Sequence, residues 1–166
     1  MQIRLAELSD IPQIIQMIAE VVPAMIAAGN FQWDSTYPNA EVFEKDIALQ
    51  QLWVAAIDDE IVGVSAITTD QSPEYAEVGW DLNEPSIVTH RLAVSPKHQG
   101  KGIAAALLLK AEEVATNKGI NALKIDTNTA NHATQRLFPK LGYVFAGEIG
   151  LGFREGLRFY CYEKRV

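Results

Sequence analysis

The chain has 166 residues, of which 48% are hydrophobic and 21% are charged, and its formal net charge is −7. These values are typical of one globular domain over residues 1–166, and the acidic balance argues against general nucleic-acid binding, which needs a broad basic surface. Because Cys161 is the single cysteine, an intrachain disulfide is excluded, and a reducing, cytoplasmic location is expected.

The hydropathy pattern predicts no membrane segment. No apolar run approaches the roughly 20 residues that a membrane-spanning helix needs. The chain begins Met-Gln-Ile-Arg-Leu, without a basic region followed by an apolar core. We therefore expect neither a signal peptide nor contact with a membrane.

Hydrophobic periodicity and turn residues predict strands and helices in the order β-α-α-β-β-β-α-β-α-β-β. Ser9 is expected to cap the first helix, which Pro23 should kink or split and Gly29 should end. This order favours a mixed α/β sheet with helices on both faces. The predicted elements are a strand over 2–7, a helix from Ser9 to Gly29, a helix over 40–50, strands over 52–57 and 61–68 forming an antiparallel hairpin, a loop over 70–86, a strand over 87–95, a helix from Ile103 to Gly119, a strand over 122–127, a helix over 131–141, and strands over 143–149 and 157–163.

The segment 92–109 carries the strongest functional pattern. It runs from an apolar strand through a loop of small and basic residues into a helix, and Gly100 and Gly102 stand where that helix should begin. Helix N-termini expose unpaired N–H groups that bind anions, and glycine lets the backbone approach them closely. No acidic residue occurs between Glu84 and Glu112. The segment therefore predicts a pyrophosphate site.

A dinucleotide-binding fold is one alternative, because Gly100-x-Gly102-x-x-Ala105 also satisfies the dinucleotide pattern and Asp126 ends the next strand. Two observations count against a nicotinamide-dependent oxidoreductase. The five residues 95–99 separate the strand from Gly100, and too few βα units are predicted for a doubly wound sheet.

The run Gln99-Gly100-Lys101-Gly102-Ile103-Ala104 resembles Gln/Arg-x-x-Gly-x-Gly/Ala, the acyl-CoA signature of the GNAT superfamily of N-acetyltransferases. Leu92-Ala93-Val94 is similar to the family's central strand, and Asn131 with Leu141-Gly142-Tyr143 is similar to its Asn…Leu-Gly-Phe pattern. The resemblance covers essentially the whole chain and looks closest to small, mostly uncharacterised bacterial members. It implies the GNAT fold and acetyl-CoA as co-substrate.

In this family, main-chain groups of the central strand bond the pantetheine arm, and one N–H polarises the thioester carbonyl. The family also places an asparagine like Asn131 beside the coenzyme, and the same residue suits a helix N-cap. The resemblance thus implies ten acetyl-CoA-binding residues: Leu92, Ala93, Val94, Gln99, Gly100, Lys101, Gly102, Ile103, Ala104 and Asn131.

The general base is expected on the strand that precedes the glycine turn. The family often uses a glutamate of this strand, but none stands there. Strand alternation would place Val88, His90, Leu92 and Val94 on one face, so His90 is the candidate base, with a purely structural role as the alternative. Glu77, in the preceding loop, is a second candidate that could act through water.

The general acid is not evident. Many family members have a tyrosine four residues before the glycine of Leu-Gly-Phe, but here Phe138 stands there and has no proton to give. Tyr160 is a candidate substitute, as are Tyr143 and Tyr162, although each also suits a packed strand aromatic. Pro139 should make the end of this helix irregular.

Trp33 and Tyr37 are expected either to form walls of the acceptor pocket or to pack in the core. No metal is expected, because the three histidines show no ligand spacing. The sequence thus predicts an N-acetyltransferase whose acceptor, a small-molecule or peptide amine, attacks directly in a ternary complex. A non-catalytic acyl-CoA-binding module is the alternative, and a homodimer is left open.

Overall fold

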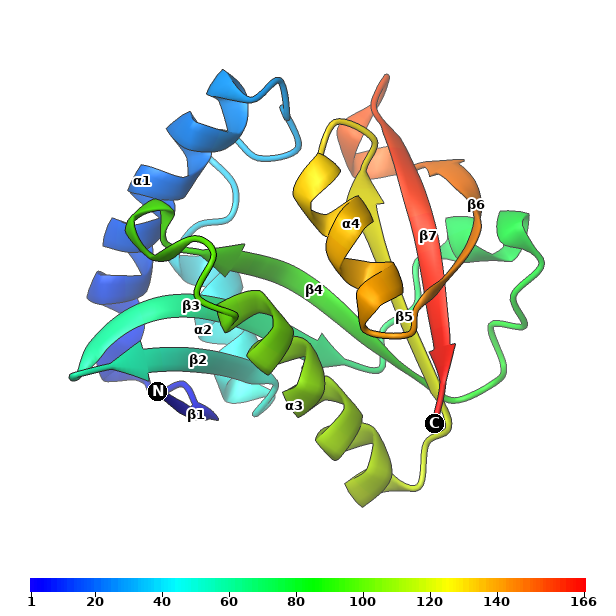
Figure 1. Ribbon diagram of the computed structural model, residues 1–166, viewed down its shortest axis with the longest axis horizontal. Helices are drawn as coiled ribbons and strands as arrows, with labels where there is room; N and C mark the ends of the chain where they lie inside the picture. The colour runs from blue at the N-terminus through cyan, green and yellow to red at the C-terminus, as the bar shows by residue number, and fades with distance from the viewer. The chain divides into compact units, whose positions relative to one another are not determined.

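A computed structural model describes residues 1–166, which form seven strands in one mixed sheet of order β1-β2-β3-β4-β5-β7-β6, with flanking helices (Figure 1). This arrangement confirms the expected fold class. The elements are β1 (Gln2–Leu5), α1 (Ile11–Ala27), α2 (Ala40–Ala48), β2 (Leu52–Ile57), β3 (Glu60–Thr68), β4 (Ser86–Val94), α3 (Ile103–Lys118), β5 (Ala122–Asn128), α4 (His132–Lys140), β6 (Val144–Gly150) and β7 (Arg158–Arg165).

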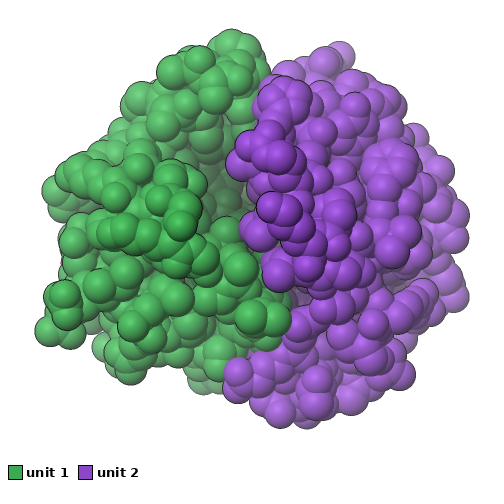
Figure 2. All heavy atoms as spheres, in the orientation of Figure 1, with its two compact units in different colours: residues 1–67, 89–110 green, residues 68–88, 111–166 purple.

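The chain divides into two compact units (Figure 2). The first comprises residues 1–67 and 89–110, and the second comprises residues 68–88 and 111–166. In the first unit, β2 pairs antiparallel with both β1 and β3, so the predicted hairpin is confirmed. The apolar faces of α1 and α2 share one core with these strands and with Ala93 of β4.

The start of α1 differs from the prediction. Ser9 does not cap the helix, because it lies inside a short 3-10 turn (Leu8–Asp10) that leads into α1. The carboxylate of Asp10 instead accepts hydrogen bonds from the Glu7 backbone N–H at 2.8 Å and from the guanidinium of Arg4. The helix continues unbroken through Pro23, so it is not split. A proline removes a single backbone donor, and the buried residues around it keep the helix against the core.

The segment Leu8–Ala27 is long and apolar enough, by length and composition alone, to cross a membrane, contrary to the sequence expectation. One such helix near the N-terminus is weak evidence, since a core helix passes the same test. Here Ile14, Met17 and Ile18 are buried against the neighbouring core residues. The apolar face of α1 therefore has a partner inside the first unit.

In the second unit, β7 pairs antiparallel with both β5 and β6, and the start of β4 pairs in parallel with β5 through Ser86–Val88. Helix α4 packs on this part of the sheet (Figure 1), where the Phe138 ring contacts the Tyr162 ring of β7. The predicted loop 70–86 contains a 3-10 helix (Pro73–Val78). The buried Lys124 ammonium donates to Gln71 at 2.8 Å and so ties this loop to β5.

Candidate functional site

The turn before α3 has the geometry of an anion site. Gly100 and Gly102 both have φ +76°, a conformation that L side chains rarely adopt, and a Cβ at either position would meet nothing within 4 Å. The first hydrogen bond of the helix runs from the Ala106 N–H to the Gly102 carbonyl at 3.0 Å. The amides before it have no helical partner, and the first turn holds no acidic residue. Open space beside exposed N–H groups fits a diphosphate.

A close contact with β3 fixes where α3 begins. Ile103 and Leu107 are buried on the face of α3 that meets β3. A Cβ on Gly63 would lie 2.7 Å from Cγ2 of Ile103 and 3.2 Å from Cδ1 of Leu107, so only glycine permits this approach. The sequence analysis did not identify Gly63, whose one visible signal is a glycine inside an otherwise apolar strand.

The basic side chains around the turn differ in their surroundings. The Lys97 ammonium lies 3.3 Å from the Glu20 carboxylate of α1 and is largely exposed. Nδ1 of His98 is buried and has no hydrogen-bond partner. The Gln99 amide donates to the Val94 carbonyl at 3.2 Å, which fixes the loop to the end of β4, while Lys101 is exposed. Lys101 therefore contributes a positive charge at the turn, while the charge of Lys97 is paired with that of Glu20.

Strand β4 does not keep the regular alternation that the sequence predicts. Arg91 has φ +53°, a left-handed conformation typical of a β-bulge rather than of extended backbone. Leu92 and Val94 pack against the cluster of Ile103 and Leu107. Val88 belongs to a different cluster, and the left-handed Arg91 interrupts the extended backbone on which the expected single face over residues 88–94 depends.

His90 lies half-buried on β4, immediately before Arg91. Trp33 is 4% exposed and belongs to the core cluster, which is the packing alternative left open by the sequence. The Tyr37 hydroxyl accepts a hydrogen bond from Nη1 of Arg91 at 3.3 Å. The first unit thus brings Tyr37 into contact with β4 beside His90, through an arginine that the sequence analysis passed over.

The other predicted site residues belong to the second unit. Glu77 is exposed on the 3-10 helix Pro73–Val78. Tyr160 lies half-buried on β7, with its ring centroid 5.6 Å from that of Phe145. Asn131 caps α4, because its side-chain oxygen accepts from the Thr134 N–H at 3.2 Å, as predicted.

Phe138 is a core residue rather than a site wall. It is 1% exposed, and its ring centroid lies 5.8 Å from that of Tyr143 and 5.3 Å from that of Tyr162. Burial raises the pKa of both tyrosine hydroxyls, and Pro139 lies inside α4 without ending it. The aromatic group that replaces the family's tyrosine is therefore packed inside the second unit.

A second buried polar group joins the 70–86 loop to β5. The Tyr75 hydroxyl donates to Oδ2 of Asp126 at 2.5 Å, and burial, followed by the charge of Asp126, raises the pKa of Tyr75. Cys161 faces Asp126 across the β5–β7 ladder. Burial, with smaller effects from Asp126 and Glu77, raises the pKa of Cys161 to about 12. Cys161 is therefore a buried core residue with a protonated thiol.

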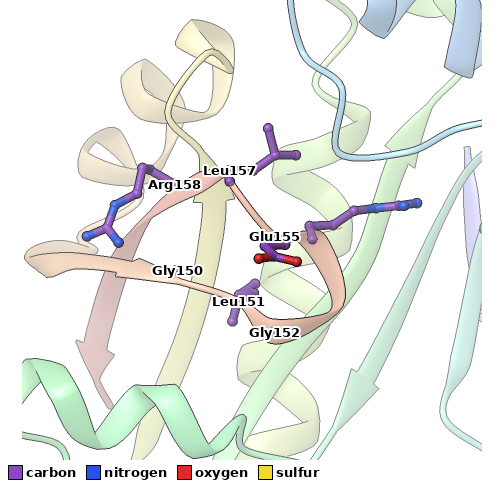
Figure 3. A pocket seen from close by; sticks show the side chains of 8 residues that line it. Gly150, Leu151, Gly152, Glu155, Leu157 and Arg158 are labelled. Carbon is purple, nitrogen blue, oxygen red and sulfur yellow. The ribbon is translucent and has the colours of Figure 1, made fainter.

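The β6–β7 connection encloses an open hollow of about 400 Å³, lined by residues 150–152 and 154–158. Figure 3 shows Leu157 and Arg158 pointing in opposite directions from successive positions. Arg158 forms an ion pair with Glu148 at 3.3 Å. None of the predicted site residues lines this hollow. Separately, no group of three or more His, Cys, Asp or Glu side chains suited to a metal ion occurs in residues 1–166.

Comparison with known proteins gives one consistent family. A sequence model of the acetyltransferase (GNAT) family matches residues 20–143. The chain is 25% identical over 142 residues to the uncharacterised N-acetyltransferase YesJ of Bacillus subtilis, covering 83% of this chain and 75% of that one. It is 27% identical over 96 residues to N-acetyltransferase 8F1 of Rattus norvegicus, covering 58% of this chain but 40% of the rat protein. The chain thus spans about two fifths of the length of the first curated relatives it matches.

Solved structures agree with this assignment. A GNAT-family acetyltransferase from Streptococcus agalactiae superposes with a TM-score of 0.84 at 27% identity, over 99% of this chain and 95% of that one. The PaiA N-acetyltransferase of Thermoplasma acidophilum, solved in complex with coenzyme A, superposes with a TM-score of 0.73 at 18% identity, over 99% and 98% of the two chains. The second likeness is one of fold alone.

Proposed function

Because the chain belongs to the acetyltransferase (GNAT) family, we propose that it transfers an acetyl group from acetyl-CoA to a primary amine by direct attack in a ternary complex. The observation that carries this proposal is the turn before α3, with Gly100 and Gly102 at φ +76° and no acidic residue in the first helical turn. Coenzyme A bound to the Thermoplasma relative is consistent with the same co-substrate here.

The binding residues follow from the turn and from the family resemblance. The N–H groups at the start of α3, with Gln99 and Lys101 beside them, are assigned to the diphosphate. Ile103 anchors the helix in the core while Ala104 stands in its first turn. The backbone of Leu92, Ala93 and Val94 is assigned to the pantetheine arm and to the carbonyl that becomes negatively charged, and Asn131 to the same arm. Bound acetyl-CoA would supply the activated acetyl thioester.

His90 is assigned as the base that removes a proton from the acceptor amine. It immediately precedes the bulged Arg91 and stands two residues from Leu92. Glu77, acting through water, is the alternative base, and Tyr160 is the candidate proton donor to the departing thiolate. That thiolate, with a pKa of roughly 8.5, leaves readily near neutral pH, so turnover does not depend on a strong acid. Alignment of two bound reactants can supply several kcal/mol of the barrier.

A small-molecule amine or an amine of a peptide is the proposed acceptor, and Tyr37 is the residue we assign to its pocket. The acidic balance of the chain favours a cationic acceptor. We also propose a cytoplasmic location, which the single cysteine is consistent with.

A second function, a non-catalytic acyl-CoA-binding module, is favoured by one observation: the position of the usual tyrosine acid holds the buried Phe138. A turnover assay separates the two functions. Release of free CoA from acetyl-CoA, stimulated by at least one amine in a broad panel, supports the enzyme. Tight acetyl-CoA binding without stimulated release by any amine supports the binding module.

The assignment of His90 predicts that His90→Ala lowers kcat/KM by about 10²–10⁴ while acetyl-CoA affinity stays nearly unchanged. The pH–rate profile should also change, because the substitution removes the proposed base. Melting temperature, acetyl-CoA affinity and the pH–rate profile are measured on the same variant. A stable His90→Ala protein with an unaltered pH–rate profile would transfer the role to Glu77 or to solvent.

A further inference from the structure

The backbone of β4 adopts a costly conformation at the residue between two proposed site positions. Arg91, at φ +53°, separates His90 from Leu92. Residues other than glycine rarely occupy this region, and they persist there only where surrounding contacts hold them. The structure must therefore contain contacts that hold Arg91.

Those contacts come from α2. Nε of Arg91 lies 2.7 Å from Oδ2 of Asp46, and Nη2 lies 2.7 Å from Oδ1, so the guanidinium and the carboxylate form a two-pronged pair. Asp46 is almost fully buried, and its Oδ1 also accepts from the Gln51 amide at 2.9 Å. Burial by itself would lower the pKa of Arg91, but the hydrogen bonds and charge of Asp46 outweigh it and raise that pKa. Arg91 therefore stays charged.

A third hydrogen bond of the Arg91 guanidinium reaches the loop that precedes α2. Nη1 of Arg91 donates to the Tyr37 hydroxyl oxygen at 3.3 Å. One guanidinium thus ties three separate segments of the first unit together: the bulge of β4, the buried face of α2, and the 31–39 loop. Tyr37 is the residue assigned to the acceptor pocket, and His90 and Leu92 flank the bulge.

We propose that Asp46 and Arg91 form a positioning clamp, which holds β4 in the bulged conformation that His90 and the Leu92 backbone need for acetyl transfer. The same clamp fixes the position of the Tyr37 side chain relative to these two residues. The observed contacts of the clamp run to its neighbours, so both residues are assigned a positioning role through His90, Leu92 and Tyr37. The inference rests on the proposed function. A small displacement of reacting groups costs catalysis far more than it costs binding at a distant diphosphate turn.

The first unit offers a matched control. Arg4 and Asp10 form a second two-pronged pair, with 2.8 and 2.9 Å between guanidinium nitrogens and carboxylate oxygens, remote from β4. The substitutions Arg91→Lys and Arg4→Lys each keep a positive charge and lose the planar fork. Asp46→Asn keeps the shape of the partner and removes its charge.

In steady-state kinetics, Arg91→Lys and Asp46→Asn should lower kcat by about 10- to 100-fold, whereas acetyl-CoA affinity changes much less. Arg4→Lys should lower the melting temperature without a comparable loss of kcat. If Arg91→Lys and Arg4→Lys lower the melting temperature alike and leave kcat alike, the Arg91 pair is only structural and the proposal is wrong.

Two further variants isolate the backbone conformation. Arg91→Gly and Arg91→Ala both remove the ion pair, but glycine adopts positive φ without strain. Arg91→Gly should therefore retain more kcat than Arg91→Ala. Equal losses in the two variants would contradict a role for the bulged backbone.

Hydrogen–deuterium exchange separates this proposal from the proposed function. The peptide that covers residues 88–95 should exchange faster in Asp46→Asn than in the wild type, and Arg4→Lys should leave it unchanged. If the wild type turns over no amine, the proposed function fails, and exchange alone then decides on the clamp. Unchanged exchange of this peptide in Asp46→Asn would overturn it.

Discussion

Phe138 shows how one side chain alters the catalytic assignment. It stands where many relatives have a tyrosine, yet its ring is packed between Tyr143 and Tyr162 and is 1% exposed. A proton donor at this position would therefore have to be built inside a packed core. The general acid, if one is needed, belongs to another residue, and Tyr160 remains the proposal.

Phe138→Tyr should lower the free energy of unfolding by about 1–3 kcal/mol, because its hydroxyl would be buried without a partner, and it should not raise turnover. Phe145→Tyr is the control, since Phe145 on β6 is 55% exposed and its new hydroxyl can reach water. Denaturant unfolding and kcat are measured for both. A rise in kcat for Phe138→Tyr at unchanged stability would mean that this side chain faces the reactants.

Cys161 gives a pH-dependent contribution to stability. Burial raises the pKa of its thiol from 9.0 to about 12, so folding favours the neutral form. The contribution is present below pH 9 and is lost as the pH rises from 9 toward 12, because the unfolded thiol ionises first. Cys161→Ala should destabilise the protein near neutral pH but make its stability fall less steeply above pH 9. Parallel slopes of unfolding free energy against pH in the two proteins would contradict this.

The contact between β3 and α3 can be tested by a substitution at Gly63. Gly63→Ala should destabilise the protein by about 1–3 kcal/mol, because its Cβ would overlap Ile103 and displace the start of α3. Acetyl-CoA affinity should fall with it. Gly150→Ala is the control, because the nearest atom to its Cβ lies 3.4 Å away, on the Arg158 side chain. Full acetyl-CoA affinity in a destabilised Gly63→Ala protein would show that binding at the diphosphate turn does not depend on the packing of α3 against β3.

Helix ends, the hairpin turn and the cap of α4 were predictable because each depends on residues that are neighbours in the chain. Gly29 and Gly119 end helices at positive φ, Asp58 and Asp59 make the hairpin turn, and Asn131 caps α4, each as its residue type predicts. These signals act within a few residues, so they can be read without knowing the fold.

Other features depend on partners distant in the chain. Ser9 lies inside the 3-10 turn before α1 instead of capping it, and in that turn the Arg4 guanidinium and the Glu7 N–H both bind the Asp10 carboxylate. The regular alternation of β4 is interrupted at Arg91, which is left-handed and binds Asp46, 45 residues away in the chain. No periodicity argument contains either contact, and the strand alternation behind the choice of His90 fails for the same reason.

At the scale of the whole molecule, the proposed anion site at the N-terminus of α3 lies in the sequence segment that lacks acidic residues. The net charge is −7, yet no acidic residue occurs between Glu84 and Glu112. The sheet order and the family match show a GNAT acetyltransferase fold, and we assign the acyl-CoA site to this turn as part of the proposed function. The glycines mark this turn in the sequence, because backbone conformation at Gly100 and Gly102 is a local property, and the acyl-CoA site at the turn stays a proposal.

Calorimetric titration of acetyl-CoA into the wild type, Gly102→Glu and Gly119→Glu tests the central claim most directly. Gly102 and Gly119 flank α3, both have positive φ, and a Cβ on either meets nothing within 4 Å, so the two substitutions introduce the same strain and the same charge. The account predicts that Gly102→Glu weakens binding by about a hundredfold or more, because a carboxylate beside the diphosphate costs several kcal/mol, while Gly119→Glu binds like the wild type. Equal acetyl-CoA affinity in all three proteins would contradict a diphosphate site at this turn.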